Sequence, residues 1–237
     1  MNDSKSLSRI YLIPSLLAED ATHTNQKYIL DAVEVCKVFF VENERSARRY
    51  LKSIWKEMVI DDYKWIGIHK AEQAVKNQFV QFLEKGINIG IISEAGCPGV
   101  ADPGQILVGE AHKLGAKVVP LVGPSSILLA LMASGLNGQQ FQFSGYLPID
   151  NAERMKALKA LESESLKKNC TQIFIETPYR NNQLLETILK TCQPSTRLSL
   201  AVDLTSGNEF ISTKTIADWK KSSPDLHKKP VVFLLLG

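Results

Sequence analysis

Cysteine and long apolar runs are scarce in this sequence, and their scarcity excludes several classes of protein. The four cysteines in 237 residues lie scattered, without a CxxC pair or histidines at ligand spacing, so the sequence predicts neither a disulfide framework nor a metal site. No stretch approaches the roughly 20 apolar residues that span a bilayer, and the first nine residues, MNDSKSLSR, are polar. We therefore expect a globular, cytoplasmic protein with no membrane partner.

The common nucleotide and zinc signatures are missing as well. The sequence has no GxGxxG after its first expected strand, no GxxxxGKS/T and no HExxH, which argues against a Rossmann dehydrogenase, a P-loop enzyme and a zincin. The formal net charge of +3 is too small to indicate nucleic-acid binding by itself. Any nucleic-acid ligand must therefore be argued from local patterns.

What is present is a regular alternation of strands and helices. Strands are expected at Arg9–Pro14, Val38–Asn43, Trp65–His69, Ile87–Ile92 and 116–122. The segments between them have helical periodicity, including residues 44–58, and this alternation is typical of a parallel sheet covered by helices. After Asn151 the pattern changes to two helices with strands at 171–177, 197–203, 209–214 and 230–236. The sequence therefore predicts two α/β domains, 1–121 with a parallel-type sheet and 122–237 with a mixed, largely antiparallel sheet.

Three loops rich in glycine, proline and serine are the candidate ligand-binding segments. They are SEAGCPGVADPG after the fourth strand, LVGPSS at the domain junction, and ETPYR after a strand of the second domain. The first loop lies at the carboxyl end of a parallel strand, where open α/β sheets bind ligands. Glycines let a backbone approach a ligand closely, and the free amides at the start of a helix bind polar ligand atoms. We expect the set to frame one cleft.

The order and spacing of these segments identify a resemblance. SEAGCPGVADPG, VVPLVGPSSILLALMASGL, FSGYLP and IFIETPYR follow one another as in the tetrapyrrole-methylase-like, or class III, S-adenosylmethionine methyltransferases. The chain most resembles the members that methylate a cytidine 2′-hydroxyl of small-subunit ribosomal RNA. The resemblance implies two α/β domains with S-adenosylmethionine in the cleft between them, ribosomal RNA as a partner, and a homodimer.

The resemblance also implies a set of cofactor-facing residues. They are Pro14, Ser93, Glu94, Ala95, Gly96, Pro98, Asp102, Gly123, Ser125, Ser126, Glu176, Thr177, Leu204, Pro230 and Val231. For two of them a purely structural role is equally compatible with the sequence. Asp102 can serve as the first residue of an Asp-Pro-Gly turn, and Ser125 can serve as a helix cap.

Three departures from the family pattern fall on the methyl-acceptor side. The first strand continues as IPSLLAED and lacks the family's Gly-Asn pair, Asn43 replaces the usual aspartate between Glu42 and Arg45, and the segment His69–Glu72 is one residue shorter. The motifs on the cofactor side are nearly intact. The changes on the acceptor side leave the identity of the methyl acceptor open. Glu42, Glu94 and His69 are candidates for a base that takes a proton from the acceptor, and Arg45 is a further catalytic candidate; a lone histidine at a strand end is more often structural.

A basic stripe follows the second strand. Arg45, Arg48 or Arg49, Lys52 and Lys56 recur at helical spacing, which fits either a phosphate-binding surface or a solvated helix face. Three functions therefore stay open. The chain is an RNA 2′-O-methyltransferase, a methylase of a tetrapyrrole or another small metabolite, or a homologue that binds S-adenosylmethionine without catalysis.

Overall fold

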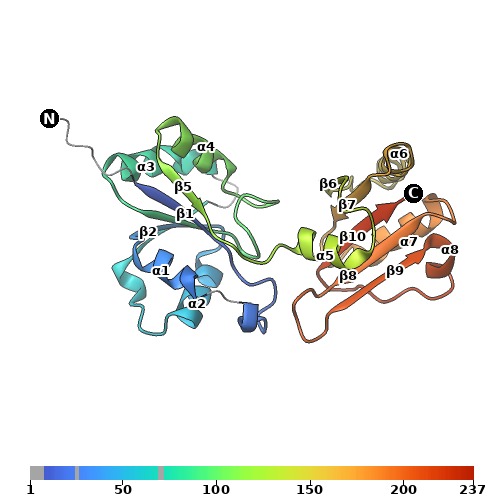
Figure 1. Ribbon diagram of the computed structural model, residues 1–237, viewed down its shortest axis with the longest axis horizontal. Coiled ribbons are helices and arrows are strands. Elements are labelled where there is room, and N and C mark those ends of the chain that lie inside the picture. Colours follow the sequence, from blue (N-terminus) through green and yellow to red (C-terminus); the bar gives the residue numbers. More distant parts are fainter. Residues whose placement is uncertain (1–7, 25–26, 69–71) are drawn as a thin grey trace. The chain divides into compact units, whose positions relative to one another are not determined.

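The computed structural model describes residues 8–24, 27–68 and 72–237. The chain divides into two compact units, Met1–Ser125 and Ser126–Gly237 (Figure 1). Both units are α/β, one with a parallel and one with a mixed five-stranded sheet, and this confirms the expected fold class.

A parallel sheet forms the centre of the first unit. Its strands are β1 (Arg9–Ile13), β2 (Val38–Val41), β3 (Lys64–Gly67), β4 (Ile89–Ile92) and β5 (Lys117–Pro120). Their order is β3-β2-β4-β1-β5, and every pairing is parallel. Ile13 and Val41 both stand opposite Ile92, so β1, β2 and β4 end at the same edge of the sheet.

Helices cover both faces of this sheet (Figure 1). They are α1 (Tyr28–Glu34), α2 (Glu44–Ile54), α3 (Glu72–Glu84) and α4 (Gln105–Lys113), with short 3-10 turns η1 (Thr22–Thr24) and η2 (Ile60–Asp62). Phe39 packs with residues of α1 and α2, whereas its neighbour Phe40 packs with residues of α3 and α4, because successive strand side chains point to opposite faces. The connections leaving β1 and β4 therefore pass over opposite faces, and such a switch point is where open sheets bind ligands.

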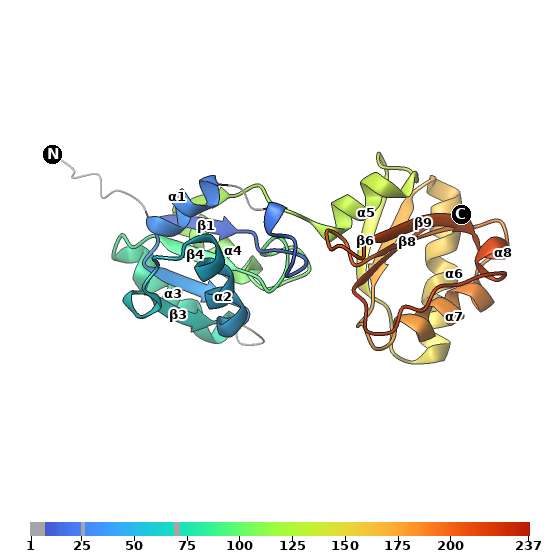
Figure 2. The same cartoon turned by 90° about the horizontal axis from the view of Figure 1, so that it is seen from below.

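The second unit has a mixed sheet of order β6-β7-β10-β8-β9. Its elements are α5 (Ser126–Ser134), β6 (Phe141–Tyr146), α6 (Asn151–Lys168), β7 (Thr171–Ile175), α7 (Asn181–Thr191), β8 (Arg197–Val202), β9 (Phe210–Thr215), α8 (Ile216–Trp219) and β10 (Val231–Leu236). β6 and β7 are parallel and the other pairs are antiparallel. One core joins α6, α7 and α8 to the sheet around Phe174 and Phe233, whose rings stack with centroids 5.8 Å apart, while α5 packs against β8, β9 and β10 (Figure 2).

Several expected boundaries in the first unit are wrong. The strands expected at Ile87–Ile92 and 116–122 are Ile89–Ile92 and Lys117–Pro120, and two further differences have a cause in the structure. The helix expected to reach residue 58 ends at Ile54, because the Lys52 ammonium donates hydrogen bonds to the carbonyls of Lys56 and Met58 and so holds a turn at the helix end. The second strand stops at Val41, since Asn43 serves as the cap of α2. His69 lies outside the described residues.

Candidate functional site

The loops that follow β1 and β4 are joined by a short antiparallel bridge. The Ser15 N–H donates to the Gly96 carbonyl at 2.9 Å, and the Gly96 N–H donates back at 3.2 Å. The Ser15 hydroxyl donates to the Ser93 carbonyl at 3.1 Å, and the Ser93 hydroxyl donates to the Gly96 carbonyl at 3.3 Å. Ser15, Ser93 and Gly96 are buried, so these bonds fix the start of the glycine-rich loop.

Two glycines in this region are needed for close approach. Gly96 has φ +75°, and a Cβ there would lie 3.2 Å from both Leu17 Cδ2 and the Pro124 carbonyl oxygen. Gly123 packs against the Pro14 ring so closely that a Cβ would lie 2.2 Å from Pro14 Cβ. No real side chain tolerates the second distance, so the loops after β1, β4 and β5 can meet only with glycine at these positions.

Three carboxylates gather at the ends of β2 and β4. Glu42 follows β2, and its Oε2 accepts a hydrogen bond from the Glu94 N–H at 2.9 Å. Asn43 Nδ2 donates to Glu94 Oε1 at 3.3 Å. The charges of Glu42 and Glu94 also act on Asp102, so the three acidic residues named from the sequence lie together in the first unit.

Asp102 is the carboxylate of this group with a perturbed acidity. Its partial burial, and then the negative charge of Glu42, raise the pKa of Asp102 to about 6, against a smaller lowering by a hydrogen bond from Ser93. Burial, and then the charge of Asp102, also raise the pKa of the Cys97 thiol, whose Sγ lies 3.4 Å from the Pro124 carbonyl oxygen. Cys97 is therefore a poor nucleophile, while Asp102 changes charge just below neutral pH.

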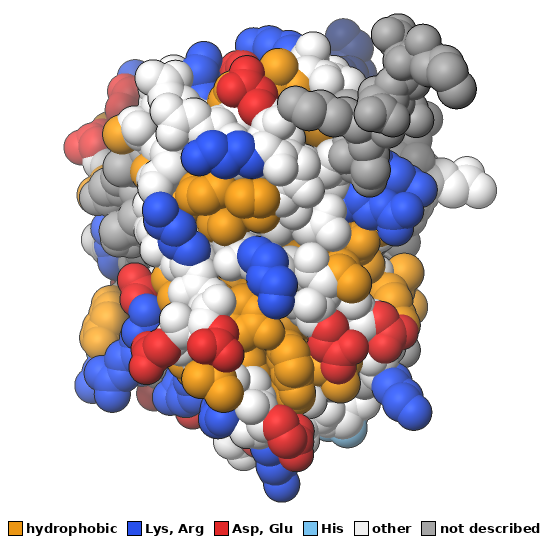
Figure 3. All heavy atoms as spheres, turned by 90° about the vertical axis from the view of Figure 1, so that its left-hand side faces the viewer, with side chains coloured by type: hydrophobic (Ala, Val, Ile, Leu, Met, Phe, Trp, Pro, Cys, Tyr) orange, Lys and Arg blue, Asp and Glu red, His pale blue; other side chains and the backbone are white. Residues whose placement is uncertain are grey.

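The basic stripe on α2 is largely occupied by contacts within the protein. Arg48 pairs with Glu44 and lies over the Trp65 ring, 5.3 Å from its centroid. Arg49 pairs with Glu19 at 2.5 Å. On the face drawn in Figure 3, lysine and arginine side chains are interspersed with acidic and apolar ones rather than gathered in one patch. These contacts favour the solvated-face interpretation of the stripe over phosphate binding.

The second unit brings its predicted residues to one edge of its sheet. Val202 at the end of β8 stands opposite Val231 at the start of β10, and β10 pairs in turn with Ile175 at the end of β7. The Asp203 N–H donates to the Pro230 carbonyl at 3.0 Å. These pairings gather the predicted residues at this edge; they are Glu176, Thr177, Leu204, Pro230 and Val231.

Glu176 is buried there as a charged group. Burial raises its pKa, but hydrogen bonds from Arg180 and the Thr177 N–H, together with the Arg180 charge, outweigh that effect and leave the pKa below its ordinary value. Its Oε1 accepts from Arg180 Nη2 and from the Thr177 N–H, each at 2.6 Å. The second carboxylate oxygen, Oε2, is buried and has no hydrogen-bond partner among the residues that the structure describes, and the same holds for Asn181 Oδ1 and Thr205 Oγ1.

These unpartnered oxygens suit a polar ligand. A buried oxygen without a hydrogen bond costs free energy, about 1–3 kcal/mol for each group, and a ligand that carries hydroxyl or amino donors would remove that cost. S-adenosylmethionine carries such donors on its ribose, adenine and amino groups. The acceptor oxygens of this edge therefore fit the cofactor that the resemblance implies.

The sequence motifs indicated the glycine-rich loop of the first unit and the residues around Glu176 in the second unit. They did not indicate the residues that hold these two groups in place. Ser15 and Arg180 were not singled out, nor were Asn181 and Thr205 with their buried oxygens. A signal existed for Arg180, which stands four residues after Glu176. Of the junction serines, Ser125 ends the first unit and Ser126 begins the second, where it is the first residue of α5.

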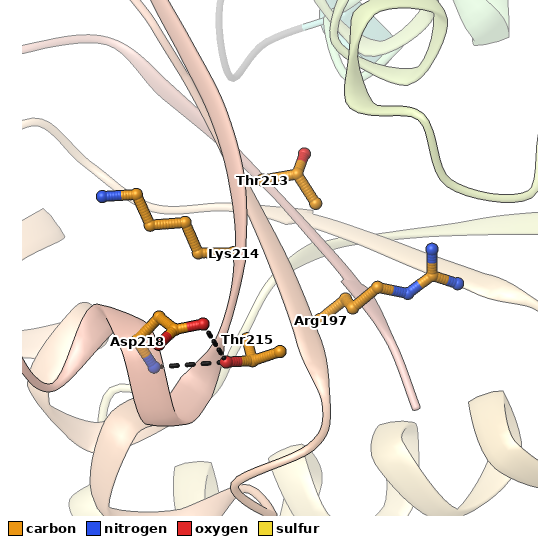
Figure 4. A pocket seen from close by; sticks show the side chains of 5 residues that line it. All are labelled: Arg197, Thr213, Lys214, Thr215 and Asp218. Carbon is orange, nitrogen blue, oxygen red and sulfur yellow. Dashed lines mark hydrogen bonds between the residues drawn. The ribbon is translucent and has the colours of Figure 1, made fainter.

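The second unit also carries an open pocket of about 520 Å³ that the predicted residues do not line. Arg197, Thr213, Lys214, Thr215 and Asp218 line it (Figure 4). Arg197 is the first residue of β8, so the pocket lies at the opposite end of that strand from Leu204. Thr215 and Asp218 are hydrogen-bonded to each other as the cap of α8. The pocket thus contains helix-capping residues and is separate from the predicted site.

None of the helices in residues 8–24, 27–68 and 72–237 is long and apolar enough to cross a bilayer. Within those same ranges, no group of three or more histidine, cysteine or acidic residues is placed to hold a metal ion.

Comparison with known proteins identifies relatives, although no family model matches the chain. The ribosomal RNA small subunit methyltransferase I of Vibrio cholerae is 29% identical over 247 residues, which cover all of this chain and 81% of the relative. The protein of the same name from Escherichia coli O157:H7 is 34% identical over 169 residues, 70% of this chain and 58% of the relative.

Solved structures share the fold. A diphthine synthase matches with a TM-score of 0.69 at 15% identity, over 97% of this chain and 89% of that one. The uroporphyrin-III-C-methyltransferase of Thermus thermophilus matches with a TM-score of 0.56 at 15% identity, over 97% and 92%. The chain belongs to the tetrapyrrole methylase family. Membership of this family confirms the expected enzyme class, methyltransferase, and the expected cofactor, S-adenosylmethionine.

Proposed function

We propose that this member of the tetrapyrrole methylase family transfers a methyl group from S-adenosylmethionine to small-subunit ribosomal RNA, at a ribose 2′-hydroxyl. The observation that carries the proposal is the match to two proteins named ribosomal RNA small subunit methyltransferase I. The chain spans less than two thirds of the length of the E. coli relative. The RNA substrate is therefore part of the proposal, whereas the family is shown.

The cofactor would be held by two groups of residues. In the first unit the backbone of the loop from Ser93 to Asp102 passes the cofactor; Gly96 lets this loop pack against Leu17 and Pro124, and Gly123 packs against Pro14. In the second unit the edge around Glu176 and Leu204 supplies acceptors for the adenosine. Three further residues, Pro14, Ser125 and Ser126, belong to the proposed set, together with Ala95 and Pro98 in the loop and Thr177, Pro230 and Val231 at the edge.

The bound cofactor supplies an electrophilic methyl group on a sulfonium centre. The chain's residues must orient the acceptor hydroxyl in line with that methyl, which is a proximity effect. They must also accept the hydroxyl proton. Glu94 is the proposed acceptor, because its side chain is exposed while Glu42 is engaged with the Glu94 N–H. His69 lies outside the described residues and Arg45 carries no proton-accepting atom, so neither is assigned a role.

The proposal is tested by mass spectrometry of ribonucleosides from small subunits of cells with and without the gene. We expect one 2′-O-methylated nucleoside to disappear without the gene and to return with the wild-type gene but not with Glu94→Gln. An unchanged ribonucleoside profile would overturn the RNA substrate and favour the methylase of a small metabolite. The homodimer and the cytoplasmic location expected from the sequence are part of the same proposal, and sedimentation of the purified protein at about twice 26.4 kDa would support the former.

A further inference from the structure

An exposed tyrosine in the second unit lies beside a lysine and a histidine. Tyr179 is 71% exposed. Lys228 Nζ lies 5.9 Å from the centroid of its ring, and the His227 ring meets it edge-on with centroids 6.0 Å apart. We call Tyr179, His227, Lys228 and Lys229 the Tyr179 surface. All four side chains are exposed. For Tyr179 this exposure is unusual, because packing tends to bury a large aromatic ring.

The segment carrying the two lysines is held firmly against the segment carrying the tyrosine. The Lys228 N–H donates to the Pro178 carbonyl at 2.9 Å, and Asn181 Nδ2 donates to the Lys229 carbonyl at 2.7 Å. The Asn182 side chain accepts from the Leu226 N–H at 2.8 Å. Three hydrogen bonds between segments some 45 residues apart, with Leu226 fully buried between them, keep this surface ordered.

Lys228 itself has an unfavourable backbone conformation. Its φ is 60°, in the left-handed region that costs a residue with a side chain roughly 1–2 kcal/mol. Strained residues persist where the surrounding structure fixes them, and they cluster at functional sites. Here the strain places a lysine beside an exposed aromatic ring, where glycine would relieve the strain but supply no charge.

The charge near this surface is positive where it is free. Asp225 is the nearest acid along the chain, and its charge acts on His227 and Lys229; its Oδ1 also accepts hydrogen bonds from Asn182 Nδ2 at 2.7 Å and from the His227 N–H at 3.0 Å. Glu176 is buried and paired with Arg180. Lys228 is the exposed cation placed beside the ring, and Lys229, which follows it in the chain, is exposed as well.

An exposed aromatic ring with flanking cations suits an unpaired nucleotide. A base stacks on the ring face, and its phosphate is attracted to the neighbouring cations. We infer that the Tyr179 surface binds a single-stranded segment of the RNA substrate, with one base stacked on Tyr179 and a phosphate beside Lys228 and Lys229. This inference rests on the proposed function and adds a binding surface in the second unit to it.

The test measures binding of a fluorescein-labelled single-stranded RNA by anisotropy over a series of salt concentrations. Stacking of one base predicts that Tyr179→Ala weakens binding roughly tenfold. Tyr179→Phe keeps the ring, so its affinity should stay within about twofold of wild type. Lys228→Asn tolerates the left-handed backbone and should lower the salt slope by about one unit. Lys190→Gln removes an equally exposed lysine from the far end of α7 and should change neither quantity.

Two further measurements separate this surface from the cofactor site and from the proposed function. Calorimetry with S-adenosylhomocysteine should give the same affinity for Tyr179→Ala and wild type, and thermal unfolding should show that the variant folds. RNA affinity that is unchanged in Tyr179→Ala, or absent in the wild type, would overturn the surface. If wild-type protein binds RNA through Tyr179 but methylates no small-subunit RNA, the surface stands and the proposed function fails.

Discussion

The Asn43 side chain links the start of α2 to the loop after β4 with both ends of its amide. Its Oδ1 accepts from the N–H groups of Arg45 and Ser46, at 3.0 and 3.2 Å, and its Nδ2 donates to Glu94 Oε1 at 3.3 Å. An aspartate, which the family resemblance predicts here, would cap the helix equally well but could not donate to a carboxylate. The exchange of aspartate for Asn43 therefore suits the position that Glu94 takes in this chain.

Asn43→Asp should weaken binding of S-adenosylhomocysteine at pH 8 roughly fivefold. The new carboxylate would stand beside Glu94, and two like charges at about 4 Å in a water-like medium repel by about 1 kcal/mol. The loss should shrink at pH 5, because Asp102, whose pKa is about 6, is then largely protonated and the acidic cluster carries less negative charge. Calorimetry at the two pH values measures it, with Asn43→Ser as the control that caps α2 without adding charge; an equal loss in the serine variant at both pH values would rule out repulsion.

Gly96→Ala should destabilise the protein more than Gly99→Ala does. The two glycines have similar φ, +75° and +78°, but a Cβ at Gly99 meets nothing within 4 Å, whereas one at Gly96 meets Leu17 and the Pro124 carbonyl. Both variants should lose about 1–2 kcal/mol from the backbone conformation, and Gly96→Ala should lose more and also bind S-adenosylhomocysteine weakly. Urea unfolding and calorimetry measure the pair. Equal losses in both assays would mean that the close approach at Gly96 is unimportant.

The ionisation of Asp102 should make the free protein less stable as the pH rises toward neutral. The pKa of Asp102 is about 6 in the folded protein and 3.8 ordinarily, so folding favours its protonated form. Its favourable contribution is complete below pH 3.8 and disappears as the pH rises through about 6. Asp102→Asn should therefore be more stable than wild type at pH 7.5, by a margin that shrinks toward pH 5.

Thermal unfolding of both proteins without cofactor, at intervals from pH 5 to pH 8, tests this dependence. A difference in melting temperature that does not vary with pH would show that burial of the Asp102 charge does not contribute to the difference in stability between the two proteins.

Arg180→Met should cost about 2 kcal/mol or more of unfolding free energy. It would leave the Glu176 carboxylate, whose side chain is 1% exposed, buried without its cation, and breaking buried pairs is strongly destabilising. Lys168→Met is the matched control, because Lys168 pairs with Glu164 at the same i,i+4 spacing on an exposed helix surface; exposed pairs of this kind contribute about 0.5 kcal/mol or less. Similar losses in the two variants would contradict the charged, buried state of Glu176.

Local sequence patterns sufficed for the strands and helices but not for the contacts between them. Apolar runs and the change of pattern after Asn151 predicted both sheets, most clearly at β2, β4 and β10, where every residue of the strand is buried. The error at the end of α2 has a local cause. Trp55 and Met58 continue the helical periodicity, but the Lys52 ammonium donates hydrogen bonds to carbonyls beyond Ile54, where the helix has ended. Side-chain contacts that end a helix leave no periodic signal.

The candidate site shows the same division. The glycine-rich loop was evident because glycine and proline are rare in strands and helices. The contact between Glu42 and Glu94 depends on the register that sets Val41 opposite Ile92, and no local pattern contains that register. The Tyr179 surface was likewise invisible, because residues 178–182 and 225–230 meet only through the fold of the second unit.

Transfer of a labelled methyl group tests the proposed activity most directly. Purified protein is incubated with methyl-labelled S-adenosylmethionine and with small ribosomal subunits from cells that lack the gene, and the RNA is digested to nucleosides. We expect label in one 2′-O-methylated nucleoside, with Gly96→Val inactive because it blocks the cofactor loop. No label in RNA from any subunit preparation, under conditions where the protein binds S-adenosylhomocysteine, would contradict the RNA substrate.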